Sequence, residues 1–226
     1  MPTLPPLLRH ALVGGTLALL LGGCVTDGGP GLFGGSGQSA ASAKTLNEAD
    51  AMAKGGDPAG ALAVLEKAIR ANPGDRALKS SYGRILVSNG HAEQALPILQ
   101  AAYDKDHPDW RNLNAQGAAL DQLGRMDEAQ ERYSHALALQ PNEPSVLTNL
   151  GLSYALSKKL DKAEEAMRLA VAQPGATPKM RQNLAFVLTL RGKYAEAKQT
   201  VAADLGEQKA ADSVNYWRKN YASKKG

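Results

Sequence analysis

The sequence has a single cysteine, Cys24, among its 226 residues. One thiol cannot form an intramolecular disulfide, so a disulfide framework is excluded. An excess of one charge is also missing, because 26 lysines and arginines against 22 acidic residues leave a formal net charge of +4. That balance is too small and too scattered to indicate a nucleic-acid partner. The spacing of His91, His107 and His135 places them on different surfaces, so we expect no metal site, no cofactor and no catalytic residues.

Long hydrophobic runs are scarce as well. Residues 11–21 form an apolar run of about eleven residues, whereas a bilayer-spanning helix needs roughly 20. The run follows Arg9 and is followed by small residues, a pattern typical of a secretory signal. The sequence therefore predicts a signal peptide over residues 1–23.

The end of this signal, Leu21-Gly22-Gly23-Cys24, resembles the lipobox of bacterial lipoproteins, in which the cysteine is acylated and becomes the mature N-terminus. The resemblance implies lipidation of Cys24, which is a stable anchor because two or more acyl chains hold a protein firmly on a membrane. The residue that follows is Val25 rather than the aspartate of an inner-membrane retention signal. This implies an outer-membrane lipoprotein facing the periplasm. An ordinary signal peptide with a chance cysteine is the alternative.

Residues 24–41 are expected to be the lipidated N-terminus and a flexible linker. Residues 25–41 contain six glycines, one proline and two serines. A chain of this composition and length spans about 20–25 Å by random-coil scaling. The folded part is therefore expected to float close to the membrane without entering it.

One fixed period runs through the rest of the chain. Gly83, Gly117 and Gly151 are equally spaced, and the same spacing joins Ala61, Ala95, Ala129, Ala163 and Ala197. This spacing is the period of the tetratricopeptide repeat (TPR), and the segment NAQGAALDQLGRMDEAQERYSHALALQPNEP closely resembles the pattern of that repeat. The resemblance implies an all-α solenoid of about five helix-turn-helix units over residues 42–205. The repeats start near residues 42, 76, 110, 144 and 178.

Three glycines in one phase of a helix need a physical reason, because each costs about 1 kcal/mol relative to alanine. We expect each glycine to face the alanine that follows twelve residues later, which lets the two helices of a repeat approach closely. Residues 206–226 are expected to hold a capping helix and tail, with an apolar stripe of Val214, Trp217 and Tyr221 covering the open end.

In TPR proteins a concave groove lined by the first helix of each repeat binds an extended or helical partner segment. Carried over to this sequence, the resemblance implies a groove that is polar and basic in its middle and apolar toward its C-terminal end. The candidate groove residues are Arg84, Arg111, Asn114, Asp121, Leu152, Leu156, Phe186 and Leu190. The apolar members could equally be ordinary packing between repeats, and this alternative stays open.

The lipobox, the glycine-rich linker, five repeats and the C-terminal segment 181–222 together resemble the TadD family of tight adherence (Flp) pilus lipoproteins. Membership implies a non-enzymatic, pilotin-like scaffold. Its partner would be the outer-membrane secretin or another pilus assembly component. The alternative is a general cell-envelope scaffold or regulator that acts on peptidoglycan enzymes or on outer-membrane barrel assembly. An enzyme is not expected, because the acidic pairs and glycine pairs match no catalytic or phosphate-binding motif.

Overall fold

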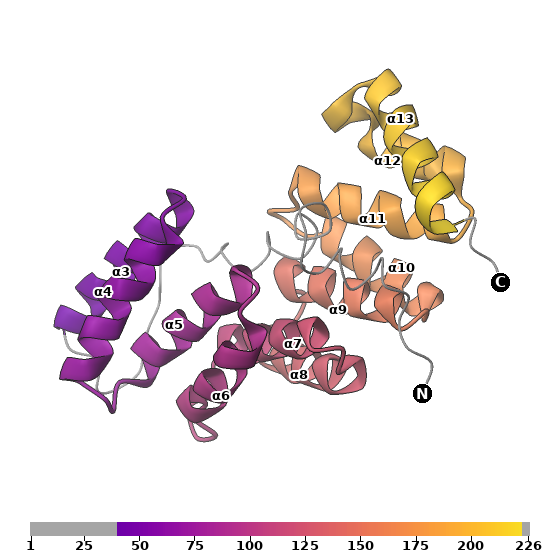
Figure 1. The fold of residues 1–226 in the computed structure, drawn as a ribbon. Helices are drawn as coiled ribbons and strands as arrows, with labels where there is room; N and C mark the ends of the chain where they lie inside the picture. Colours follow the sequence, from indigo (N-terminus) through magenta and orange to yellow (C-terminus); the bar gives the residue numbers. More distant parts are fainter. Residues whose placement is uncertain (1–39, 223–226) are drawn as a thin grey trace. The chain divides into compact units, whose positions relative to one another are not determined.

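The computed structural model describes residues 40–222, and every secondary-structure element in that range is helical. The signal peptide, Cys24 and linker residues 24–39 lie outside the described residues. The chain divides after Gln140 into two compact parts, which we call the N-terminal part and the C-terminal part. Within each part the two helices of a repeat pack side by side (Figure 1).

The N-terminal part holds three pairs of helices. They are α3 (Ala40–Lys54) with α4 (Pro58–Ala71), α5 (Arg76–Ser88) with α6 (Ala92–Ala102), and α7 (Trp110–Gln122) with α8 (Met126–Leu139).

The C-terminal part holds two pairs, followed by a further helix that ends in a π-helical turn. The elements are α9 (Pro144–Leu156) with α10 (Leu160–Val171), α11 (Pro178–Leu190) with α12 (Tyr194–Leu205), then α13 (Glu207–Trp217) and η1 (Arg218–Ala222).

The helix boundaries follow the period of the sequence. The helices α5, α7, α9 and α11 begin at residues 76, 110, 144 and 178, which is where the period places the start of each repeat. The first helix, α3, begins at Ala40, two residues before the expected start near residue 42 and inside the predicted linker. The all-α repeat fold predicted from the sequence is confirmed.

A polar residue caps the first helix of each of these four repeats, and the cap itself recurs with the same period. The carboxylate of Asp75 accepts a hydrogen bond from the backbone N–H of Leu78 at 3.1 Å, and that of Asp109 accepts one from Arg111 at 2.9 Å. Side-chain oxygens of Glu143 and Thr177 accept in the same way at the starts of α9 and α11. Each cap satisfies a backbone donor that the helix leaves unpaired, which fixes the residue at which the helix starts.

The glycines in the first helices lie under large side chains of the second helices, which differs from the expectation that each faces an alanine. A Cβ added to Gly117 would lie 2.6–2.8 Å from ring atoms of Tyr133, and one on Gly83 would lie 2.6–2.8 Å from Leu99. The expected alanine partner of Gly83 presents only its backbone carbonyl, 3.6 Å away. Because glycine has no side chain, the two helices can approach closely while a large side chain, sixteen positions after the glycine, still fits between them.

The same pairing continues in the repeats that lack the glycine. Ala49 and Ala185 take the glycine position, and both are fully buried. The residue sixteen positions after Ala185 is Val201, which is smaller than the leucine, tyrosine and methionine of the other repeats. The fifth repeat thus combines an alanine with a smaller partner, whereas the first repeat combines Ala49 with a leucine and shows no such compensation. The five pairs are Ala49 with Leu65, Gly83 with Leu99, Gly117 with Tyr133, Gly151 with Met167, and Ala185 with Val201.

The turn inside each repeat needs a residue with a positive φ. Glycine fills this place in four repeats, with φ values between 76° and 89° for Gly56, Gly90, Gly124 and Gly192. In the fourth repeat Lys158 occupies the position with φ 60°. A side chain in this left-handed conformation costs about 1–2 kcal/mol, so the turn of the fourth repeat is held by the packing of its helices.

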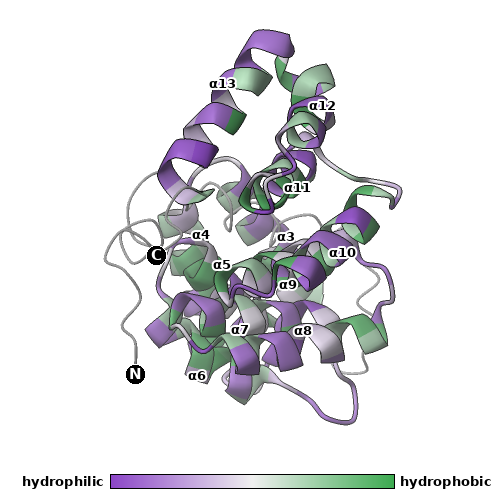
Figure 2. Cartoon of the chain, turned by 90° about the vertical axis from the view of Figure 1, so that its right-hand side faces the viewer, coloured by the Kyte–Doolittle hydropathy of each residue, from purple (hydrophilic) through white to green (hydrophobic). Residues whose placement is uncertain are grey.

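The C-terminal helix covers the last repeat, as predicted. Val214 is buried, and the rings of Trp217 and Tyr221 pack edge-on against Phe186 of α11, with centroids 5.8 and 5.6 Å apart. Residues along α13 are otherwise mostly hydrophilic (Figure 2). A capping helix of a repeat array has this composition, because only its inner side needs to be apolar.

An ion-pair cluster ties the fourth repeat to the fifth within the C-terminal part. The carboxylate of Glu164 on α10 accepts hydrogen bonds from Arg168, Arg191 and Lys193. Burial by itself would raise the pKa of Glu164, but the three cationic donors outweigh it and lower the pKa to about 2. Because Arg191 and Lys193 lie at the turn between α11 and α12, the cluster fixes this turn against α10.

We predict that Gly117→Ala destabilises the N-terminal part. The added methyl would overlap the ring of Tyr133, which is fully buried and whose hydroxyl lies 3.0 Å from a carboxylate oxygen of Asp121. The ring has no free space to move into, so overpacking outweighs the gain of about 1 kcal/mol in helix propensity. We expect the free energy of unfolding to fall by about 2 kcal/mol, measured by urea denaturation.

A second change provides the control for this variant. The double variant Gly117→Ala/Tyr133→Leu copies the pair Ala49 and Leu65 of the first repeat. In a double-mutant cycle the two changes are expected to couple favourably by about 1 kcal/mol or more. Additive effects would show that the glycine is not there to accommodate the tyrosine.

We predict that Glu164→Gln lowers stability at neutral pH and removes part of its dependence on acid. A carboxyl whose pKa falls from 4.5 to about 2 on folding stabilises the protein fully above pH 4.5. This contribution is lost as the pH falls from about 4.5 toward 2. We expect a loss of about 2–3 kcal/mol at pH 7, and a difference between wild type and variant that shrinks below pH 4.5, measured by denaturation at each pH. A pH-independent difference would contradict this account.

Candidate functional site

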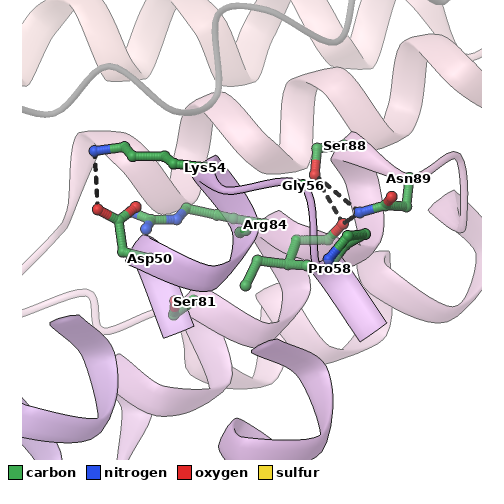
Figure 3. Close-up of a pocket in the computed structure, with 10 residues that line it drawn as sticks. Asp50, Lys54, Gly56, Pro58, Ser81, Arg84, Ser88 and Asn89 are labelled. Carbon is green, nitrogen blue, oxygen red and sulfur yellow. Dashed lines mark hydrogen bonds and ion pairs between the residues drawn. The ribbon is translucent and has the colours of Figure 1, made fainter. Parts of the chain in front are cut away.

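A hollow of about 410 Å³ lies between the first helices of the first two repeats, α3 and α5 (Figure 3). One wall comes from α3 and the turn after it, and the other from α5 and its C-terminal end. The lining residues are Asp50, Ala53, Lys54, Gly56, Pro58, Ser81, Arg84, Ile85, Ser88 and Asn89. The lining is thus mainly polar and charged and contains no aromatic residue, which distinguishes it from the mostly apolar pockets that hold small molecules.

Local hydrogen bonds hold the rim of the hollow on the α5 side. The hydroxyl of Ser88 and the side-chain amide of Asn89 both donate to the backbone carbonyl of Ile85, at 2.9 and 2.7 Å. The same carbonyl also accepts the backbone N–H of Asn89 at 3.2 Å, so three donors converge on it and fix the end of the helix. Ile85 itself belongs to the hydrophobic core shared by α3, α4 and α5, so this wall of the hollow is firmly packed.

Arg84 is the most unusual residue of the hollow. Its Nε is buried without a hydrogen-bond partner, and among the described residues its guanidinium forms no ion pair. Desolvation is the main cause that lowers the pKa of Arg84; the nearby Arg111 also lowers it, whereas Asp109 and Asp50 raise it. A buried Nε without an acceptor is unfavourable, so the position of this partly exposed side chain needs an explanation other than stability.

The two carboxylates near Arg84 are engaged elsewhere. Asp50 pairs with Lys54 at 2.9 Å along α3, and Figure 3 shows this pair beside Arg84. Asp109 accepts the backbone hydrogen bond that caps α7. Both carboxylates favour the charged form of Arg84 through space, but neither accepts a hydrogen bond from its Nε.

The sequence assigned Arg84 to the groove but missed the residues of the first repeat that face it. Asp50 and Lys54 stand one period before Arg84 and Ser88, so they occupy the same positions in the repeat. Counting back one period from Arg84 and Ser88 would therefore have identified Asp50 and Lys54 as residues of the same surface. Sequence reasoning passed over them because the first repeat is the least regular of the array.

The other candidate groove residues of the N-terminal part divide into exposed and buried positions. Arg111 is partly exposed, and its guanidinium lies over the ring of Trp110, 4.5 Å from the centroid. Asn114 is 3% exposed and Asp121 fully buried, so neither presents its side chain on a surface. A carboxylate oxygen of Asp121 instead accepts a hydrogen bond from the hydroxyl of Tyr133 within the same repeat.

The apolar candidates of the C-terminal part divide in the same way. Leu152 and Phe186 are 5% and 8% exposed, and Phe186 lies under Trp217 and Tyr221. Leu156 and Leu190, which end α9 and α11, remain partly exposed. The packing alternative therefore describes both Leu152 and Phe186, while Leu156 and Leu190 remain available for a partner.

The described part of the chain offers neither a metal centre nor a membrane span. Within residues 40–222 no three histidine, cysteine or acidic side chains come together as a set that could hold a metal ion. No helix of that range combines the length and the apolar character that a membrane span requires.

The comparisons with known proteins point to one family. Two profiles described as tetratricopeptide repeat match the chain, one over residues 52–117 and the other over residues 114–179. Together they cover residues 52–179, which is more than half of the sequence.

The curated relatives are much longer than their shared segments. The chain is 31% identical to a probable SPINDLY N-acetylglucosaminyltransferase of Solanum lycopersicum over 110 residues, which are 48% of this chain and 12% of that protein. Across the curated relatives the chain spans between 12% and 53% of their length. The shared segments are thus repeats, and they carry no transferase activity over to this chain.

Solved structures match most of the described chain. A thermophilic TPR protein of Thermus thermophilus has a TM-score of 0.66 at 22% identity, over 78% of this chain and 97% of that one. PilF of Pseudomonas aeruginosa has a TM-score of 0.60 at 20% identity, over 80% and 92% of the two chains. At these identities the similarity shows the fold alone.

We predict that Phe186→Ala destabilises the C-terminal part, because the ring packs against Trp217 and Tyr221 of the capping segment, by which we mean α13 and η1. Removal of a buried phenylalanine and its edge-on contacts is expected to cost about 3 kcal/mol. In a Trp110→Phe background the fluorescence of Trp217 should then shift to the red as its indole becomes hydrated. Unchanged stability and emission would show that Phe186 is a surface residue and that the capping segment is held elsewhere.

Proposed function

This chain belongs to the tetratricopeptide-repeat proteins, which are scaffolds for protein–protein interaction, and we propose that it is an outer-membrane lipoprotein that assists pilus assembly. In this proposal Cys24 carries the lipid and the repeats face the periplasm. The surface formed by the first helices holds a segment of the outer-membrane secretin or of another tight adherence (Flp) pilus component. The role is pilotin-like and involves no chemistry.

The observation that carries the proposal is the combination of a lipobox cysteine with a repeat array that starts close behind it. Only residues 25–39 separate Cys24 from the first helix of the array. A tether of this length and composition keeps the repeats within a few tens of ångströms of the lipid headgroups. A partner segment would therefore be presented at the membrane into which a secretin must insert.

The C-terminal segment supports the assignment to pilus assembly rather than to a general scaffold. Residues 181–222, which carry the resemblance to the TadD family, form most of α11, all of α12 and the capping segment. The resemblance therefore covers the last repeat except the first three residues of α11, together with the aromatic contacts of Phe186 with Trp217 and Tyr221. The similarity to PilF concerns the fold and adds no partner.

The partly exposed leucines give the proposal a surface that can be tested. Leu156 and Leu190 stand one period apart at the ends of two successive first helices, so they occupy equivalent positions within the C-terminal part. An apolar strip of this kind suits the apolar side of a bound helix or extended segment. Leu152 and Phe186 are too deeply buried to serve as probes of binding.

We predict that a deletion strain loses secretin multimers and surface pili. Complementation with the wild-type chain should restore both, whereas Cys24→Ser should leave the protein unanchored and restore neither. The double variant Leu156→Asp/Leu190→Asp should remain anchored and folded but should capture at least about tenfold less secretin, because two charges enter an apolar contact. The measurements are detergent-resistant secretin multimers on gels, pilus counts by microscopy and pull-down of the secretin.

Leu169→Asp is the matched control for the leucine variants. This leucine lies on the second helix of the fourth repeat and is 45% exposed, so it receives the same change away from the proposed surface. It should restore multimers and capture secretin as the wild type does. Normal multimers in the deletion strain would contradict the pilus role. Capture of a peptidoglycan synthase or a barrel-assembly protein in place of the secretin would favour a general envelope scaffold.

A further inference from the structure

We infer that the hollow between α3 and α5 binds a side-chain carboxylate of an extended acidic segment in the partner protein, and that Arg84 is the residue that pairs with it. The inference rests on the proposed role as a protein scaffold, but not on the partner being a secretin. It assigns a chemical class of ligand to one position on the surface of the N-terminal part.

The first argument is that the buried Nε of Arg84 lacks an acceptor, although the side chain as a whole is partly exposed. A buried donor without an acceptor is unfavourable, and structural arginines normally satisfy it with a carboxylate. Here the Nε has neither solvent nor acceptor, while Asp50 is paired with Lys54 and Asp109 caps α7. An incoming carboxylate would supply the missing acceptor.

The second argument is that the guanidinium is placed to receive a ligand rather than sealed in the core. Arg84 lines a hollow of about 410 Å³, together with the hydroxyl residues Ser81 and Ser88 (Figure 3). This volume is at the lower end of the range for ligand pockets, which suits one or two side chains of a peptide. A guanidinium presents its N–H groups as a planar fork that matches the two oxygens of a carboxylate.

The third argument concerns why the anion is a carboxylate and not a phosphate. Asp50 and Asp109 are close enough to Arg84 to raise its pKa, so they would repel any anion that enters. The repulsion is about twice as large for a dianionic phosphate group as for a carboxylate with one charge. Lys54 and Arg111 are also close, so the three cations exceed the two carboxylates by one charge, which matches a ligand with a single negative charge.

The experiment selects peptides against the full-length chain purified in detergent, with a phage library of random dodecapeptides. Wild type, Arg84→Gln and Arg70→Gln are used in parallel. Arg70 is an exposed arginine on α4 that pairs with Glu66, so it controls for the loss of one positive charge. We expect the wild type and Arg70→Gln to select peptides that share an aspartate or glutamate at one aligned position. Arg84→Gln should lose that preference.

Synthetic peptides then test the pairing directly. For the best glutamate-containing peptide, Glu→Gln should raise the Kd for the wild type by about tenfold to a hundredfold, measured by fluorescence anisotropy. The same peptide change should have little effect on binding to Arg84→Gln. A phosphoserine version should bind no more tightly than the glutamate peptide.

Several results would overturn the inference. They are the absence of any selected peptide, a set of selected peptides without a shared acidic residue, and an acidic preference that survives in Arg84→Gln. Tighter binding of the phosphoserine peptide would assign the hollow to phosphate instead.

Stability provides an independent check on the role of Arg84. Arg84→Met keeps the aliphatic volume and removes the unpartnered charge, so its Tm should equal or exceed that of the wild type. A Tm lower by about 5 °C or more would show that Arg84 is a structural residue, and would overturn the inference. The Glu→Gln peptide series uses the wild-type protein and does not depend on how either variant folds.

Failure here and failure of the pilus role can be told apart. If the deletion strain has normal secretin multimers, the pilus role is wrong, but the peptide selection can still show a carboxylate preference that depends on Arg84. If the deletion strain has defective multimers and the selected peptides show no such preference, the carboxylate site is wrong and the pilus role stands.

Discussion

The close approach of two helices at one point in each repeat is the constraint on which the rest of the fold depends. In the second, third and fourth repeats a glycine of the first helix lies under a large buried side chain of the second helix, and in the first and fifth an alanine takes its position. This contact sets the distance between the two helices. Once that distance is fixed, the caps that start each first helix and the turn with a positive φ can recur at the same spacing. Each repeat then presents its first helix in an equivalent position.

The period predicted the repeats and their starting residues, because spacing alone determines where equivalent helices begin. It could not predict which side chain covers each glycine. In each repeat both the alanine and the large residue four positions after it recur with the period, as Ala95 and Leu99 do. Only the rotation of the second helix about its axis determines which of the two faces the glycine. Lys158 was also beyond prediction, since lysine gives no signal for a left-handed turn. Its conformation is imposed by the packing of α9 and α10, a tertiary effect that overrides local preference.

The candidate groove residues could be predicted from the sequence where the exposure of a side chain depends only on its position in the repeat. Arg84, Arg111, Leu156 and Leu190 keep partly exposed side chains, as their positions suggest. Asp121 departs because a hydrogen bond from Tyr133 accompanies its burial in its own repeat, and Phe186 departs because the capping segment lies over it. Asn114 and Leu152 are buried as well, so four of the eight candidates do not present their side chains on a surface. The position in the repeat gives the exposure of an average repeat, whereas the contacts of Asp121 and Phe186 are particular to this chain.

The way in which charges are satisfied differs between the two parts of the molecule. In the C-terminal part Glu164 has three cationic partners, and its low pKa shows that the cluster stabilises the fold. In the N-terminal part Arg84 is desolvated, and the carboxylates nearest to it serve other groups. Charges that hold repeats together are expected to be mutually paired, because folding selects against an unpaired buried ion. Arg84 is partly exposed and its buried Nε has no acceptor, so it is better explained by something that the protein binds than by its own stability.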